Sequence, residues 1–196
     1  PASMTTLEKI IQAKHRRIGI QKLSNSFTDH YISSNTNIDK PRFFSHLNNC
    51  LNDHKIIAEM KKASPSAGVI INDYKPEDLA LEYQAKGYTN LSILTEEDHF
   101  LGAISHIAKV RKVSDLPILQ KDFVVDEWQI YQAKTIGVDC ILLISEILTK
   151  EELNSFIKTA KSLKLDVLLE FHDEIEIEKI KDIELDYIGI NNRNLR

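Results

Sequence analysis

The residue types best suited to chemistry in this chain are Glu59 and Lys61, a carboxylate and an ammonium one residue apart. They close an apolar run that begins at Lys55 and has the length of a strand, and a turn-forming segment follows at 64–68. Side chains two apart in a strand point to the same face, so the pair would share one face at the strand's carboxyl end. Such a pair beside a loop of hydroxyls and backbone N–H groups suits acid–base chemistry on an anionic substrate. A surface ion pair at a strand exit is an equally good interpretation of this stretch alone.

The elements that must position these residues form a repeat of apolar runs and helical segments. The predicted strands are Lys55–Met60, Asn90–Leu94, Pro117–Lys121, Cys140–Ser145, Asp166–Phe171 and Tyr187–Asn191. Most are near-continuous Ile, Leu and Val, as in parallel strands that are buried on both faces. The repeat predicts an α/β fold with a parallel sheet, either a (β/α)₈ barrel or a doubly wound sheet. No Gly-x-Gly-x-x-Gly follows the first strand and no Walker loop is present, which favours the barrel.

Helices are predicted by their start and stop signals. They are expected over 6–22, from Pro41, over 76–86 and 126–136, and after Thr149 and Asp173. Thr149 and Glu152 have the spacing of a capping box, and Asp173 and Glu176 repeat it.

Two predicted helices precede the first strand, so residues 1–54 are expected to form an N-terminal extension to a barrel of residues 55–196. The first helix has an apolar stripe made by Leu7, Ile10, Ile11 and Ile18. Lys14, Arg16 and Arg17 are expected largely off that stripe. Pro41 fits the first turn of the second helix, and the polar segment 24–37 between the two helices is predicted as loop.

Polar side chains recur where each predicted strand ends. They are Glu59 and Lys61, Thr95 and Glu96, Lys121 and Asp122, Ser145 and Glu146, Glu170 and His172, and Asn191, Asn192 and Arg193. In barrels this rim holds the active site. Solvation of loops explains part of the pattern, but it fits Lys121 and Glu170 poorly because each directly follows an apolar run.

The bulk composition narrows the class of partner. The chain of 196 residues has a net charge of −4 and no block of Lys and Arg, so neither nucleic acid nor a membrane surface is expected as a partner. Local basic groups still permit a small anionic substrate. Cys50 and Cys140 lack metal-ligand spacing, and two free thiols without a signal peptide predict a cytoplasmic protein.

Five blocks of the sequence resemble the indole-3-glycerol phosphate synthase family. They are Ile57–Ser66, Ile93–Glu96, Leu119–Phe123, Leu169–His172 and Ile188–Leu195. The blocks span most of the chain in the family's order, and the first and last are the most specific. The N-terminal helices also resemble the extension that packs across the barrel in this family. One departure is Gln120, where the family usually has arginine before the lysine.

The resemblance implies conversion of 1-(2-carboxyphenylamino)-1-deoxyribulose 5-phosphate to indole-3-glycerol phosphate, carbon dioxide and water, without a cofactor or metal. Lys121 matches the general acid of ring closure in this family. Lys61 and Glu170 match the acid and base that remove water, and Glu59 matches the residue that orients the lysines.

The resemblance also implies substrate contacts. Phe123 is expected to stack on the aromatic ring of the substrate, and the other expected contacts are Ser64, Glu96, Asn191, Arg193 and Leu195. His172 and Trp128 are interpreted as a loop-exit histidine and a packing residue.

Two other functions remain open at this point. A catalytically silent barrel could keep the rim residues, and a phosphoribosylanthranilate isomerase would be a second phosphate-binding barrel of the same pathway. The isomerase would not need rim lysines after the first and third predicted strands, which counts against it.

A final expectation concerns the size of the chain. A (β/α)₈ barrel needs eight strands and about 250 residues, so about 50–60 residues and the main phosphate site are expected to be missing after Arg196. The chain alone is then expected to be inactive or nearly so, and to pair its open sheet edges with another copy or with a supplied C-terminal piece.

Overall fold

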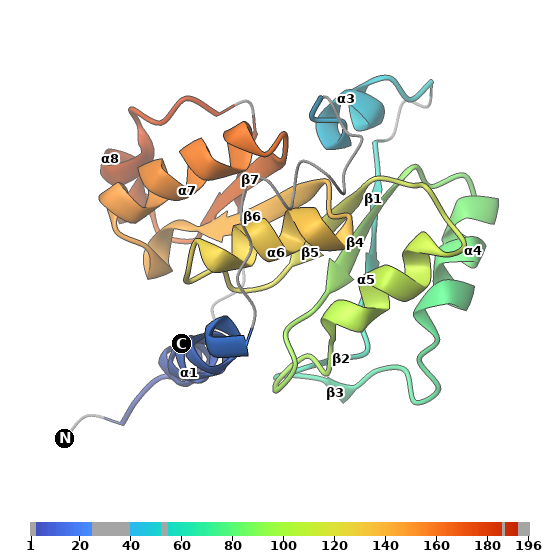
Figure 1. Cartoon of the computed structure of the whole chain (residues 1–196), viewed down its shortest axis with the longest axis horizontal. Helices are drawn as coiled ribbons and strands as arrows, with labels where there is room; N and C mark the ends of the chain where they lie inside the picture. Colours follow the sequence, from blue (N-terminus) through green and yellow to red (C-terminus); the bar gives the residue numbers. More distant parts are fainter. Residues whose placement is uncertain (1–2, 25–39, 52–54, 186, 192–196) are drawn as a thin grey trace.

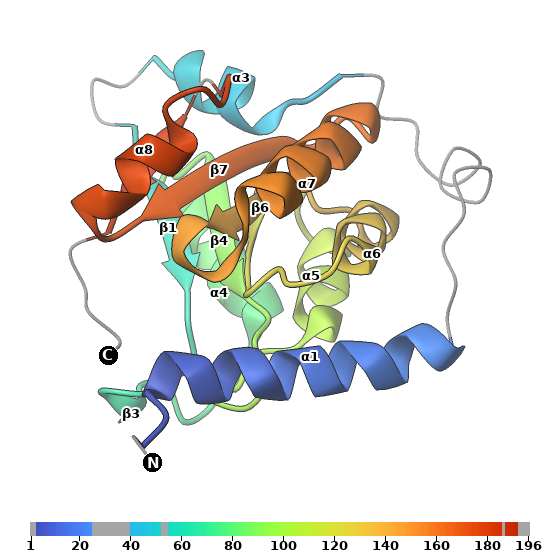
Figure 2. The same cartoon turned by 90° about the vertical axis from the view of Figure 1, so that its left-hand side faces the viewer.

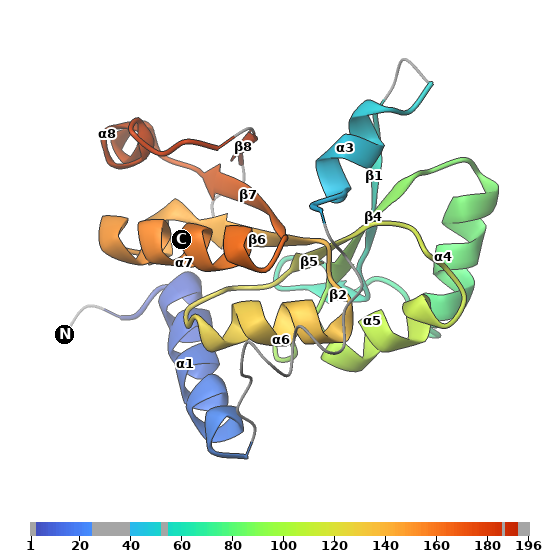
Figure 3. The ribbon, with the colours of Figure 1, turned by 45° about the horizontal axis from the view of Figure 1, so that its top comes forward.

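The centre of the molecule is a parallel sheet of six strands whose order in space follows their order in the chain. The computed structural model describes residues 3–24, 40–51, 55–185 and 187–191. The strands are β1 (Ile57–Met60), β4 (Asn90–Leu94), β5 (Ile118–Lys121), β6 (Cys140–Ile144), β7 (Asp166–Phe171) and β8 (Ile188–Ile190). The sheet curls into a half-barrel, with its helices on the convex side (Figure 3). This architecture is that of an incomplete (β/α)₈ barrel and confirms the predicted fold class.

The connecting helices form the outer layer of the half-barrel (Figure 1). They are α4 (Pro76–Ala85), α5 (Ile104–Arg111), α6 (Trp128–Ile136), α7 (Lys150–Ser162), α8 (Ile177–Ile180) and the 3₁₀ turns η1 (Ser145–Ile147) and η2 (Glu174–Glu176). Ser145 therefore starts a 3₁₀ turn and does not end a strand as predicted. After β1, the predicted loop contains a short hairpin of β2 (Ala63–Ser64) and β3 (Gly68–Val69).

Alternation along the strands divides the core into two layers. In β7, Val167, Leu169 and Phe171 pack in the layer between the sheet and the outer helices, whereas Leu168 joins the inner cluster. Glu170 shares the inner face with Leu168, since residues two apart in a strand point the same way. The apolar runs are thus explained by two-sided burial, and the inner face keeps room for polar side chains at its carboxyl end.

The two predicted capping boxes have different outcomes. Thr149 Oγ1 accepts the backbone N–H of Glu152 at 3.1 Å, and the Glu152 carboxylate accepts that of Thr149 at 3.0 Å, which confirms the first box. Asp173 caps η2, but the carboxylate of Glu176 pairs with Lys179 at 2.7 Å instead of returning to Asp173. The second box is therefore wrong, because an ion pair competes for its glutamate.

Two helices from the first 54 residues lie at opposite ends of the strands (Figure 2). α1 (Thr6–Ser24) crosses the carboxyl ends, and α3 (Phe43–Asn48) covers the amino ends. α3 begins at Phe43 with Arg42 as its N-cap, so Pro41 precedes the helix and the prediction that it occupies the first turn is wrong. Most of the segment predicted as loop, 25–37, lies outside the described residues.

The prediction that Lys14 lies off the apolar stripe of α1 is also wrong. Lys14 is 3% exposed and sits between the buried residues Ile10 and Ile18, one helical turn from each. Its ion-pair partners come from loops far along the chain, so the local sequence pattern could not predict them. Within the described residues, no helix has both the length and the apolar character needed to cross a membrane.

Candidate active site

A cavity of about 1060 Å³ lies at the carboxyl ends of the strands. Eight predicted site residues line it, namely Glu59, Lys61, Ser64, Glu96, Lys121, Phe123, Glu170 and Asn191. The remaining two, Arg193 and Leu195, lie outside the described residues. The structure therefore brings together polar groups from five strands and their following loops, as expected for the rim of a barrel.

Glu59 is the centre of the charged part of the cavity. Its Oε2 lies 2.7 Å from Lys121 Nζ, and its Oε1 lies 3.3 Å from Lys61 Nζ. Burial alone would raise the pKa of Glu59, but the ammonium groups of Lys121 and, to a smaller extent, Lys61 outweigh it and hold the pKa below its ordinary value. The carboxylate thus stays charged and gives both lysines a defined direction while they remain partly exposed to the cavity.

Glu170 lies in another part of the cavity wall, at the end of β7. Its Oε1 accepts a hydrogen bond from Asn191 Nδ2 at 2.9 Å, and the backbone N–H of Asn191 donates to the carbonyl of Phe171 at 3.0 Å. The amide therefore fixes one carboxylate oxygen of Glu170, and among the described residues none donates a hydrogen bond to the other oxygen.

The loop after β4 is organised by Glu96. Its carboxylate accepts the backbone N–H groups of Asp98, His99 and Phe100 at 2.8–3.1 Å, and it is almost completely buried. The loop closes where the N–H of Gly102 bonds the carbonyl of Glu96 at 2.7 Å. A Cβ at position 102 would stand 2.4 Å from the carbonyl oxygen of Leu94, so only glycine fits there. Glu96 borders the cavity, but this geometry favours a role in shaping the loop over direct contact with a substrate.

One side of the cavity is apolar. The rings of Phe100 and Phe123 lie with their centroids 6.4 Å apart, and Leu142, Ile144 and Leu7 extend the same wall. A planar aromatic group would find its complement on this side. The sequence did not predict that Phe100 and Leu7 line the cavity, because apolar residues are common in loops and at helix starts.

Glu146 and His172, which the sequence placed at the rim without a catalytic or binding role, line the cavity as well. Glu146 Oε1 accepts the backbone N–H groups of His172 and Asp173, and its other oxygen lies 3.5 Å from His172 Nδ1. Burial would raise the pKa of Glu146, but these N–H donors outweigh it and the pKa is lowered. Trp128 packs with Ile18 and Val125, which confirms the packing interpretation.

Gln120, the departure from the resembled pattern, points away from the charged centre. It is buried, and its Nε2 donates to Thr95 Oγ1 at 3.0 Å. The neighbouring Lys121 keeps its place on the inner face. Within the described residues, no group of three or more His, Cys, Asp and Glu side chains is arranged to hold a metal ion.

Comparisons with known proteins give the family of this chain. The family model described as indole-3-glycerol phosphate synthase matches residues 7–196. A protein of that name from Campylobacter fetus is 45% identical over 175 residues, which cover 89% of this chain and 65% of that protein. Its namesake from Endomicrobium trichonymphae is 38% identical over 97% of this chain and 74% of its own length.

A third relative of the same name, from Neisseria meningitidis serogroup B, is 45% identical over 74% of this chain and 56% of its own length. The chain therefore spans between about half and three quarters of these relatives. With the cavity, its two lysines and a family match over nearly the whole chain, the conclusion is direct: this chain belongs to the indole-3-glycerol phosphate synthase family.

Proposed function

We propose that the native polypeptide containing these 196 residues converts 1-(2-carboxyphenylamino)-1-deoxyribulose 5-phosphate to indole-3-glycerol phosphate, carbon dioxide and water. It would act as a carboxy-lyase of tryptophan biosynthesis. The observation that carries the proposal is the carboxylate of Glu59 between the ammonium groups of Lys61 and Lys121, on the inner face of the half-barrel. A rim with two cations suits a substrate that carries a carboxylate and a phosphate.

Ring closure is the first step that the site must support. The ring carbon that bears the carboxylate attacks the ketone carbon, and the ketone oxygen takes a proton from Lys121 to become a hydroxyl. The carboxylate then leaves as carbon dioxide, and its bonding electrons restore the aromatic ring. Glu59 lies 2.7 Å from Lys121 Nζ and directs that proton donor into the cavity.

Loss of water completes the indole. The hydroxyl leaves as water with a proton from Lys61. Glu170 removes a proton from the neighbouring CH₂ group, and the electrons of that C–H bond form the new double bond. Asn191 Nδ2 donates a hydrogen bond to Glu170 Oε1 at 2.9 Å, so the other carboxylate oxygen of Glu170 would accept the proton. Catalysis of this kind contributes about 10²–10⁴-fold for each positioned group.

Substrate binding divides between the two sides of the cavity. Phe123, with Phe100 beside it, would hold the aromatic ring, and Ser64 and Asn191 would contact polar groups. Glu96 would act mainly through its loop. Arg193 and Leu195 remain predicted contacts, since both lie outside the described residues.

Two proposals about the setting of the protein accompany the activity. Cys50 and Cys140 are free thiols, which fits a place in the reducing cytoplasm. The edge strand β8 exposes Ile188 and Ile190 at 45% and 71%, so the 196-residue chain by itself would associate through this edge. Sedimentation of that chain should then show species larger than a monomer.

The activity is tested by incubating the native polypeptide with the carboxyphenylamino substrate and following indole fluorescence, with product identified by mass. Formation of indole-3-glycerol phosphate is the expected result. Turnover of phosphoribosylanthranilate in its place would establish the isomerase alternative. Binding of the carboxyphenylamino substrate without turnover would establish the silent barrel, and either result would contradict the proposal.

A further inference from the structure

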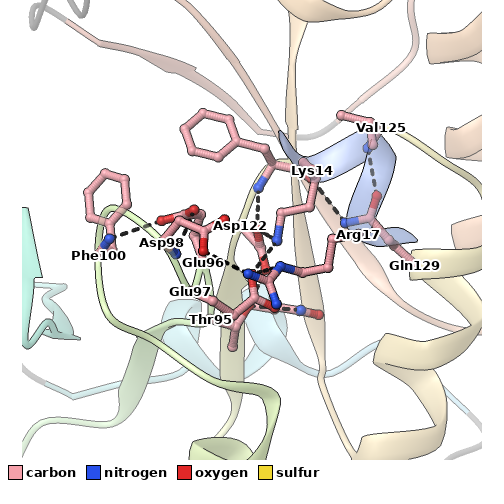
Figure 4. Close-up of polar contacts among 12 residues, drawn as sticks. Lys14, Arg17, Thr95, Glu96, Glu97, Asp98, Phe100, Asp122, Val125 and Gln129 are labelled. Atoms are coloured by element: carbon pink, nitrogen blue, oxygen red, sulfur yellow. Dashed lines mark hydrogen bonds and ion pairs between the residues drawn. The ribbon is translucent and has the colours of Figure 1, made fainter. Parts of the chain in front are cut away.

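A buried lysine on α1 reaches the end of the strand that carries Lys121. Lys14 Nζ lies 2.9 Å from Glu97 Oε2 and 3.0 Å from Asp122 Oδ1, and the side chains of Lys14 and Asp122 are each 3% exposed. Figure 4 shows the ammonium between loops that follow β4 and β5.

Lys14 belongs to a chain of ion pairs in which positive and negative side chains alternate. Arg17 continues it, with its Nε 3.5 Å from Glu97 Oε2 and its Nη2 2.7 Å from Asp98 Oδ1. α1 supplies both cations, and the loops supply all three carboxylates. Burial raises the pKa of Asp122 above its ordinary value, and Lys14 is the first group that opposes this rise. Lys14 is thus the counter-ion of a fully buried carboxyl group. Burial would lower the pKa of Lys14 itself, but Asp122 and Glu97 outweigh burial and raise it.

Asp122 in turn binds the residue that follows it and a residue of the loop after β4. Its Oδ1 accepts the N–H of Phe123 at 2.7 Å, and its Oδ2 accepts the hydroxyl of Thr95 at 2.6 Å. The backbone N–H of Thr95 donates to the carbonyl of Lys121 at 3.2 Å. One bond of Asp122 therefore fixes the backbone of Phe123, and the other fixes Thr95, which is hydrogen-bonded to the backbone of Lys121.

Docking of α1 does not need this buried pair. Ile10 and Ile18 already bury the apolar stripe, and Lys22 pairs with Asp126 at the surface at 2.9 Å. A buried ion pair adds little net stability, because desolvation of two charges offsets their attraction. What the pair does supply is a fixed orientation for the Asp122 carboxylate.

From this geometry we infer that Lys14 is a positioning residue, which anchors Asp122 and through it aligns Lys121 and Phe123 for the reaction. The inference rests on the proposed function. It gives α1 a part in the reaction without any contact between Lys14 and the substrate.

The test compares Lys14→Met with Lys14→Arg in the native polypeptide, and uses Lys22→Met as the matched control on the same helix. A shift of about 1 Å at a reacting group can cost about 10²-fold in rate. We expect kcat of Lys14→Met to fall at least about tenfold with KM within about threefold of wild type. Lys14→Arg should recover part of kcat, and Lys22→Met should match wild type.

A second comparison asks whether Lys14 acts through Asp122. Asp122→Asn removes the buried charge, so adding Lys14→Met in that background should cause little further loss of kcat. This double variant also avoids a lone buried carboxylate if Lys14→Met alone folds poorly. If the loss of kcat in the double variant equals the product of the losses in the two single variants, the inference is overturned.

Hydrogen exchange separates this inference from the proposed function. The amide of Phe123 should exchange faster in Lys14→Met than in Lys22→Met, whether or not the protein turns over the substrate. Absence of turnover in wild type would reject the proposed function, whereas unchanged exchange at Phe123, or wild-type kcat in Lys14→Met, would overturn the role of Lys14.

Discussion

The two ends of the half-barrel treat charge in opposite ways. At the carboxyl ends, Glu59, Lys61 and Lys121 keep between about a fifth and a third of their side chains exposed to an open cavity. At the amino ends, Asp139 is 1% exposed and lies 2.6 Å from Arg42 Nε and 2.5 Å from Arg111 Nη2. The carboxyl ends thus leave the charged group around Glu59 open to a ligand, whereas at the amino ends two arginines pair with a buried aspartate.

The two covering helices differ in the same sense. α3 seals the amino ends with Phe43, which is fully buried and whose carbonyl accepts a hydrogen bond from Asn90 Nδ2 at 2.9 Å. α1 crosses the carboxyl ends and brings Lys14 and Arg17 to carboxylates of the loops. The comparison teaches that stability and chemistry are served by opposite ends of the same strands, so substitutions at the two ends should have different consequences.

The largest effect is expected at the carboxyl end. Lys121→Met should lower kcat about 10²–10⁴-fold, because it removes the proposed proton donor, and KM should change little. Stability should change by less than about 1 kcal/mol, since the ion pair with Glu59 is partly exposed. Steady-state kinetics and urea unfolding measure the two quantities. A raised KM with unchanged kcat would show that Lys121 binds substrate and does not donate the proton.

At the amino end the opposite result is expected. Asp139→Ala leaves Arg42 and Arg111 without their carboxylate and the N–H of Ile118 without its acceptor. The loss of one partner of a buried pair costs about 3–5 kcal/mol. Urea unfolding should show this loss, and kcat of the folded fraction should stay at the wild-type value. A variant with normal stability and reduced kcat would contradict the division between the two ends.

The pH dependence of stability should distinguish the two ends more finely. The folded-state pKa of Glu59 lies below its ordinary value of 4.5, so its contribution is fully present above that value and is lost as pH falls through the folded pKa. Glu59→Gln should therefore reduce the fall in the free energy of unfolding at acid pH. The change in that free energy should be smaller than for Asp139→Ala, because the side chain of Glu59 is about a third exposed. Urea unfolding between pH 3 and 7 measures this. An unchanged acid limb would show that the lysines do not stabilise the charged form of Glu59.

The smallest effect is expected in the outer layer of helices, at the start of α7. Thr149→Ala removes the side-chain acceptor of the α7 capping box and should cost about 1 kcal/mol without a change in kcat. Thermal unfolding measures it. A loss of activity in this variant would mean that stability and catalysis are not separable in this fold, and the contrast between the two ends would then lose its meaning.

Much of the fold could be predicted from short-range patterns alone. The run 140–144 is buried on both faces of the sheet, so its continuous apolar character determines a strand within a residue or two. The two-residue period also determines that Glu59 and Lys61 leave β1 in the same direction. Thr149 and Glu152 determine the start of α7, because a capping box needs only residues three apart.

Tertiary structure decided what depends on partners distant in sequence. Glu59 meets Lys121 only because β1 and β5 flank β4 in the curled sheet. Lys14 was predicted to lie at the surface because lysine is usually exposed. It is buried because Glu97 and Asp122 both pair with it from two loops. Glu176 failed as a capping residue for a related reason, since Ser145, from the turn after β6, donates to its carboxylate, and Lys179 pairs with the same group. A charged side chain is placed by its counter-ion, and the position of a counter-ion far along the chain is a property of the folded chain.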